Sequence, residues 1–140
     1  MSRSLGYYTF TGSSSVTDGT ALPLTSTVRQ TGKNLSLSNN AVNIGYNCDC
    51  ASNPAGYYTV SANVTLTASS AGTASVLLYQ NGSPVPGAYQ TVTTAISDVA
   101  NFSFTAPIRV YCGQNNTTLQ LMLTGQDVTA TNVAIEVVKE

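Results

Sequence analysis

Three cysteines are the most reactive side chains of this 140-residue chain: Cys48, Cys50 and Cys112. An odd number leaves at least one thiol without a partner inside the chain. Cys48 and Cys50 are poorly placed to bridge each other, because a single residue separates them. A structural zinc site takes a full set of Cys and His ligands, and the sequence has no histidine. We expect free thiols and no metal site; a disulfide from Cys112 to Cys48 or Cys50 is the alternative.

The carboxylates are the candidates for acid–base chemistry. Glycoside hydrolysis needs two facing carboxylates at a controlled separation, whereas Asp18-Gly19 and Ser97-Asp98 are typical of turns. The lack of histidine excludes a Ser-His-Asp triad and a Cys-His pair. Neither a dinucleotide-binding glycine loop nor a Walker sequence occurs. We therefore expect no enzyme and no cofactor; a calcium ion held in the loops by Asp49 or Asp127 is the alternative. The six acids are Asp18, Asp49, Asp98, Asp127, Glu136 and Glu140.

Eight tyrosines are the remaining side chains with a binding chemistry. Tyr57 and Tyr58 are neighbours in one alternating segment, so we expect one ring in the core and the other in an interface. Tyr46, Tyr89 and Tyr111 lie near expected loops. Exposed rings on an uncharged, Asn-rich surface can stack on sugars. Half-buried rings with hydrated hydroxyls are the commoner arrangement, and they are our main expectation.

The surface around these residues carries little charge. Charged residues make up 8% of the chain, and the formal net charge is −1. This balance provides neither a basic stripe for nucleic acid nor a polybasic patch for a membrane surface. The longest apolar run, Val76–Tyr79, is far shorter than the about 20 residues of a membrane-spanning helix. We recognise no signal peptide, so we expect synthesis in the cytosol without export by the general secretory route.

The elements that must position these residues are predicted to be β-strands. Thr, Ser and Asn supply 48 of the 140 residues, and threonine favours strands whereas serine and asparagine favour turns. Residues 57–67 alternate strictly between apolar and polar, a period that no amphipathic helix gives. Asn81-Gly82 predicts a tight turn. Pro84 and Pro86 exclude a central strand, and Pro107 predicts an edge strand or a bulge. Further strands are predicted over 73–80, 89–96, 99–110, 119–123 and 132–138.

The first half of the chain is less regular. Tyr8-x-Phe10 predicts a short strand, and the Gly-, Ser- and Thr-rich residues 12–20 predict a loop. Short strands separated by regular turns are typical of a sandwich or jelly roll. We therefore expect an all-β fold of about ten short antiparallel strands. The other short strands of this half are predicted over 21–29, 34–37 and 41–46.

The order of several motifs resembles a known family. Gly56-Tyr57-Tyr58-Thr59-Val60 precedes Leu78-Tyr79-Gln80-Asn81-Gly82 and Val85-Pro86-Gly87, while Tyr7–Phe10 and Val133–Lys139 fit a first and a closing strand. This order is similar to the TNF-like jelly roll of the complement globular-head superfamily. Within it, the chain resembles the bacterial and phage branch, which includes the C-terminal head of the spore exosporium collagen-like glycoprotein. The resemblance implies a short N-terminal arm over residues 1–5 and a single jelly-roll head domain over residues 6–140.

The resemblance also implies a homotrimer in which one sheet packs around a threefold axis. The strands similar to 57–67, 117–124 and 132–138 would share that axial sheet, and their outward faces would form the subunit contacts. Tyr and Met are enriched in interfaces, and Glu136 would need a partner or a wet position. A monomeric sandwich is the alternative, and a zinc ion on the axis is a further alternative for the thiols. The expected interface residues are Tyr57, Thr59, Ser61, Gln120, Met122, Ala134, Glu136 and Val138.

These features predict a non-enzymatic homotrimeric structural head protein. The exosporium protein carries its head on a collagen-like stalk, whereas this sequence has no glycine at every third position. We therefore expect a phage virion surface protein, either a capsid decoration or a head-fibre protein, that is made in the bacterial cytosol. Its partners would be its own copies and a capsid or other surface protein. The alternative is a carbohydrate- or receptor-binding head of a tail fibre, or of a spore or cell surface.

Overall fold

Ten β-strands make up the regular structure of the described chain. The computed structural model describes residues 4–32, 34–45, 55–111 and 117–140. These residues contain no helix, and hence none long and apolar enough to cross a membrane. The strands are β1 (Leu5–Val16), β2 (Ser26–Thr31), β3 (Leu35–Ser38), β4 (Ala41–Ile44), β5 (Gly56–Ala68), β6 (Gly72–Gln80), β7 (Ser83–Thr94), β8 (Val99–Val110), β9 (Thr117–Thr124) and β10 (Val128–Lys139).

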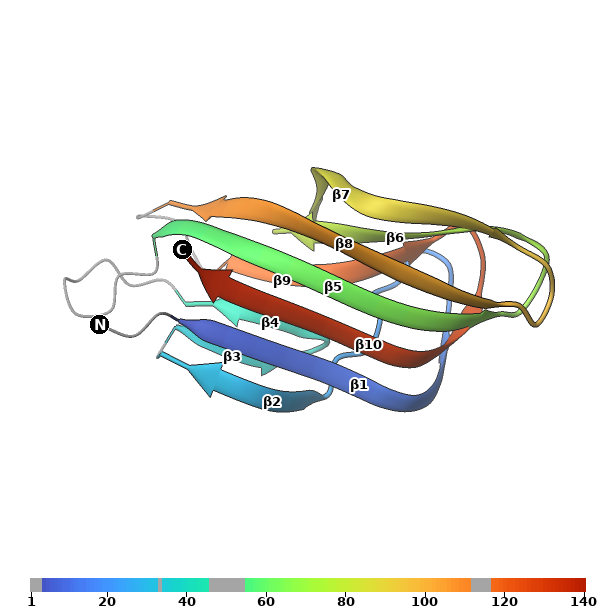
Figure 1. The fold of residues 1–140 in the computed structure, drawn as a ribbon, viewed down its shortest axis with the longest axis horizontal. Helices are drawn as coiled ribbons and strands as arrows, with labels where there is room; N and C mark the ends of the chain where they lie inside the picture. Colours follow the sequence, from blue (N-terminus) through green and yellow to red (C-terminus); the bar gives the residue numbers. More distant parts are fainter. Residues whose placement is uncertain (1–3, 33, 46–54, 112–116) are drawn as a thin grey trace.

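The strands form two five-stranded antiparallel sheets that lie face to face (Figure 1). Sheet A has the strand order β2-β1-β10-β5-β8, and sheet B has the order β3-β4-β9-β6-β7. β9 and β10, which come last along the chain, occupy the centre of sheet B and of sheet A. The structure is thus the all-β sandwich of ten antiparallel strands that the sequence predicts.

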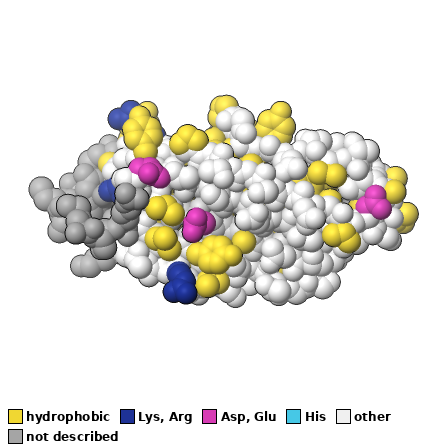
Figure 2. Space-filling view, in the orientation of Figure 1, with side chains coloured by type: hydrophobic (Ala, Val, Ile, Leu, Met, Phe, Trp, Pro, Cys, Tyr) yellow, Lys and Arg dark blue, Asp and Glu magenta, His cyan; other side chains and the backbone are white. Residues whose placement is uncertain are grey.

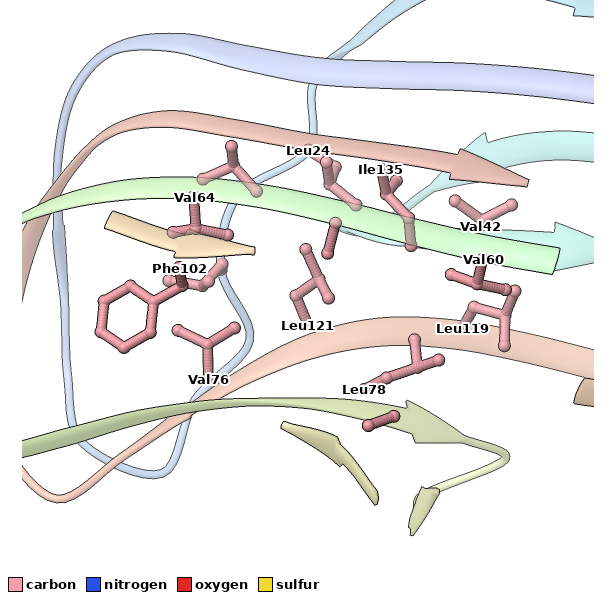
Figure 3. Packing of buried hydrophobic residues seen from close by; sticks show 14 of the residues in the cluster. Leu24, Val42, Val60, Val64, Val76, Leu78, Phe102, Leu119, Leu121 and Ile135 are labelled. Carbon is pink, nitrogen blue, oxygen red and sulfur yellow. The ribbon is translucent and has the colours of Figure 1, made fainter. Parts of the chain in front are cut away.

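The core between the sheets follows the alternation of the sequence. In β5 every second residue from Tyr58 to Leu66 is buried. Burial of one such large apolar side chain contributes about 1.5–3 kcal/mol, so a slip of β5 by one residue would be strongly unfavourable. Figure 3 shows Val60, Val64, Phe102 and Ile135 of sheet A packed with Val42, Val76, Leu78, Leu119 and Leu121 of sheet B and with Leu24.

β1 is longer than the sequence predicts. Residues 12–16 are rich in Gly and Ser and predict a loop, but they continue the strand. Ser14 pairs with Ala130 and Val16 with Val128, after a register shift between Thr11 and Ser14. The strand forms there because its partner β10 comes from the distant end of the chain, and a local pattern of turn-favouring residues does not show that partner.

The edge strands agree with the placement of the prolines. Pro107 lies in β8, the edge of sheet A, and Pro84 and Pro86 lie in β7, the edge of sheet B. A residue without a backbone N–H is tolerated at such an edge. Asn81 and Gly82 join β6 to β7 with positive φ angles of 54° and 80°, as in the favoured two-residue hairpin turn.

The turn from β9 to β10 takes the chain from sheet B to sheet A through Gly125. Its φ angle is +105°, and a Cβ atom added there would lie 2.0 Å from the carbonyl oxygen of Thr73. Both observations require glycine at this position.

Candidate interaction surfaces

The carboxylates of the loops stabilise turns. Asp18 Oδ1 accepts a hydrogen bond from the backbone N–H of Gly125 at 2.8 Å, and Asp127 Oδ1 accepts one from the N–H of Asp18 at 2.8 Å. Asp98 Oδ2 accepts one from the N–H of Ala95 at 2.8 Å. Asp98 therefore has the turn chemistry that the sequence predicts. Asp18 and Gly19 do lie in a turn, but the Asp18 carboxylate bonds the distant turn at Gly125. Among the described residues, no cluster of three or more acidic, Cys or His side chains could hold a metal ion.

Several candidates from the sequence lie outside the described residues. These are the calcium candidate Asp49, the sugar-stacking candidate Tyr46, and the three cysteines, so the expected thiol state stays a prediction. The outward faces of the two sheets are therefore the surfaces on which a described site can lie.

The expected interface residues do not share one face. β5 and β10 are neighbours in sheet A, but β9 lies in sheet B between β4 and β6. The prediction that residues 117–124 belong to the same sheet as 57–67 and 132–138 is therefore wrong. Gln120 and Met122 face outward from sheet B, opposite the other six. Alternation shows which side of a strand is buried, but not which sheet the strand joins.

Six expected residues do lie on the outward face of sheet A. Thr59 pairs with Val138, and Ser61 pairs with Glu136 across β5 and β10. Ala134, opposite Asn63, is only 6% exposed within the single chain, so it has little surface left for a partner. Tyr57, by contrast, is 55% exposed at the start of β5.

An aromatic–cation stack of Tyr57, Arg109 and Tyr111 lies at the end of sheet A where β5 begins. The Arg109 guanidinium carbon lies 5.3 Å from the ring centre of Tyr57 and 4.4 Å from that of Tyr111. Such contacts contribute about 0.5–1 kcal/mol at exposed sites. Tyr57 and Tyr111 nonetheless remain 55% and 52% exposed. Arg109 is not among the site residues expected from the sequence, although its position out of phase with buried Ile108 and Val110 places it on the outward face.

Glu140 lies at the same end of sheet A. The backbone N–H of Glu140 donates to the carbonyl oxygen of Tyr57 at 2.9 Å, and its carboxylate accepts a hydrogen bond from the Thr59 hydroxyl. The Glu140 carboxylate and the Arg109 guanidinium thus both lie at this end of the outward face.

Two further charged residues, Arg29 and Glu136, lie in one row across the middle of sheet A. Arg29 pairs with Tyr7, Tyr7 with Glu136, and Glu136 with Ser61 in successive strands. Tyr7 separates the two charged groups, so two strand spacings of about 4.8 Å lie between Arg29 and Glu136. Within the described chain neither makes an ion pair.

Hydroxyl and amide side chains occupy other positions on the outward face of sheet A. The Ser61 and Thr105 hydroxyls lie 3.3 Å apart, and the Thr65 hydroxyl donates to Asn101 Oδ1 at 2.9 Å. Figure 2 shows dark blue side chains only toward the end of the molecule where β10 ends; yellow side chains lie there, along the upper edge and at the opposite end, where a magenta side chain also lies.

The outward face of sheet B has a different chemistry. None of its five strands contains a charged residue. Across three strands Tyr89 pairs with Leu77, and Leu77 with Met122; Met122 in turn bridges to Ala21. Tyr89 is 56% exposed, and the other three are half-buried. An uncharged apolar row therefore crosses this face.

Two further tyrosines serve the core. Tyr8 and Tyr58 are fully buried in sheet A, and burial raises the pKa of each phenol to about 12. The Tyr8 hydroxyl donates to Gln30 Oε1 at 2.7 Å. The prediction that one ring of this pair lies in the core is confirmed for Tyr58, and the expected interface at Tyr57 stays a prediction.

Comparison with known proteins identifies the fold. No protein-family model matches the sequence, and no curated protein matches it. Solved structures do match: the Eiger TNF from S. frugiperda aligns over 99% of this chain and 92% of its own, with a TM-score of 0.71 and 13% identity. Murine APRIL aligns over 99% and 100%, with a TM-score of 0.65 and 11% identity. The PRD1 vertex protein P5 aligns over 97% and 96%, with a TM-score of 0.56 and 10% identity.

The chain is therefore a TNF-like β-sandwich. This confirms the fold expected from the sequence resemblance.

Proposed function

We propose that this chain is the non-enzymatic head of a homotrimer on a particle surface, with the outward face of sheet A as the subunit contact. The observation that carries the proposal is the aromatic–cation stack of Tyr57, Arg109 and Tyr111. Aromatic and Arg side chains are enriched where proteins meet, and here they lie exposed beside Glu140 and Val138. Six of the eight residues expected in the interface share this face.

The charges of this face suit contact with a second copy. Arg29 and Arg109 lie on β2 and β8, at opposite edges of the sheet, and Glu136 lies on the central strand β10. An edge of one copy that approaches the centre of the next would bring opposite charges together. Complementary charges of this kind set the register of an interface more than its strength.

The particle we propose is a phage virion, on which the protein would be a capsid decoration or head-fibre protein made in the bacterial cytosol. One protein with the same fold is the phage PRD1 vertex protein P5. The low content of titratable groups supports a structural role, because catalysis depends on groups with matched pKa values. A head from a spore or cell surface, as in the exosporium branch, is the less favoured version of the proposal.

Light scattering behind a sizing column tests the oligomer. We expect a species near three times the 14.5 kDa of one chain. A monomer at every concentration examined would overturn the trimer. Mass spectrometry of purified particles tests the location: we expect this chain in a fixed ratio to the major capsid protein, and its absence would overturn the virion assignment.

A further inference from the structure

We infer that the outward face of sheet B binds a neutral oligosaccharide, along the row formed by Tyr89, Leu77, Met122 and Ala21. This face points away from sheet A, so the inference does not depend on the proposed trimer. It assigns a function to the face that the subunit contact leaves unused.

The shape of the row suits an extended ligand. Its four residues lie side by side on β7, β6, β9 and the segment that follows β1. Three strand spacings of about 4.8 Å give the row a length of about 14 Å. Tyr79, one pleat further along β6, pairs with Gln120 and places a second ring on the same face. The row can therefore hold several sugar units in a line.

The chemistry of the face suits sugar hydroxyls and C–H groups. An aromatic ring has a negative face that attracts the slightly positive C–H groups of a pyranose. The flanking side chains are hydroxyls and amides: Ser75 and Thr91 share a hydrogen bond of 2.7 Å, whereas the Gln120 amide makes none within the described chain. Rings for stacking thus lie beside groups that can hydrogen-bond a ligand.

The absence of charge decides the ligand class. No described strand of sheet B has a charged side chain, whereas sheet A has charged residues on three of its strands. An acidic glycan or a charged peptide would lose its hydration on this face without gaining a counter-charge. A neutral hexose chain has no charged group whose hydration would be lost. A protein would also find few anchors here, because Tyr89 is the only residue of the row that is more than half exposed.

A glycan array with neutral and acidic oligosaccharides, probed with the full chain, tests the inference. We expect binding to a subset of the neutral glycans and none to their acidic counterparts. Tyr89→Ala should weaken that binding about tenfold, which corresponds to the loss of one ring contact. Ile96→Ala is the control, because Ile96 is 66% exposed in the turn between β7 and β8 and belongs neither to the row nor to the proposed subunit contact.

Three results would overturn the inference: no neutral glycan is bound, acidic glycans are preferred, or Ile96→Ala weakens binding as much as Tyr89→Ala. A photo-crosslinking residue at position 89 that joins the chain to a particle protein, with no glycan bound, would assign the face to a protein contact instead. Met122→Lys provides a second variant on the solvent side of the sheet. It should weaken neutral-glycan binding without unfolding the protein, which circular dichroism checks.

Discussion

The two sheets of this sandwich bury similar residues and expose different ones. Both turn Val, Leu, Ile and Ala inward on alternate positions. Outward, sheet A carries Arg29, Arg109 and Glu136, whereas the strands of sheet B carry no charge. The fold requires the inward pattern, but it does not require this outward difference. The difference is therefore where function is expected.

The largest effect is expected where the sheets are joined. Gly125→Ala should lower the free energy of unfolding by about 4 kcal/mol or more, because the new Cβ would clash with the Thr73 carbonyl oxygen and the φ angle is positive. Gly82→Ala has a positive φ but open space around it, so it should cost only about 1 kcal/mol. Urea denaturation measures both, and equal losses would show that the close approach to Thr73 is unimportant.

A smaller loss of stability should distinguish the inward face of sheet B from its outward face. Leu121→Ala should cost about 3 kcal/mol, because Leu121 is fully buried between the sheets. Leu77→Ala removes the same atoms from the outward face, where Leu77 is half-buried, and should cost about 1 kcal/mol. Thermal unfolding of both variants provides the comparison. A loss at Leu77 as large as that at Leu121 would mean that the outward row is covered in the folded protein.

Alkaline unfolding should depend on sheet A, because its two buried tyrosines have a pKa of about 12, above the ordinary 10.0. The neutral phenol is favoured in the folded state, so this stability is complete below pH 10 and is lost as the pH rises to 12. Each tyrosine contributes at most about 3 kcal/mol to that loss. Tyr8→Phe should reduce the slope of stability against pH in this window, as measured by urea denaturation. An unchanged slope would contradict the role of Tyr8.

The smallest effect concerns association. Glu136→Lys and Gln120→Lys each place a lysine on the outward face of a central strand, the first on sheet A and the second on sheet B. Glu136→Lys should raise the dissociation constant of the trimer at least about tenfold, because it leaves only basic groups in the middle of sheet A. Gln120→Lys should leave it unchanged. Light scattering over a dilution series measures both, and the opposite result would move the subunit contact to sheet B.

The sequence predicts three alternating strands well, misplaces the starts of β2, β7 and β10 by four to six residues, and predicts strand partners poorly. The strands predicted over 57–67, 73–80 and 99–110 agree with β5, β6 and β8 to within one residue at each end, because alternation is a local property of the chain. The sheet to which β9 belongs and the extension of β1 to Val16 depend on pairing between distant residues, which alternation does not report.

The candidate surfaces could likewise be predicted only where they depend on a single strand. The outward position of Tyr57 could be predicted from its own strand. Its stack with Arg109 and Tyr111 needs the register between β5 and β8, in which Tyr57 lies opposite Arg109. Likewise, the row of Tyr89, Leu77 and Met122 combines three strands, and its uncharged character emerges only when the strands of sheet B are known.

The central positions of β9 and β10 have a consequence for how the protein is made. While the chain is being synthesised, β4 and β6 must wait for β9, and β1 and β5 must wait for β10. Until then both half-formed sheets expose apolar faces and unpaired backbone, the state in which β proteins are most prone to aggregate. Slow translation of the last two strands would prolong that exposure, whereas a chaperone that covers strands would shorten it. The yield of native protein should therefore respond to the rate at which its last strands are synthesised.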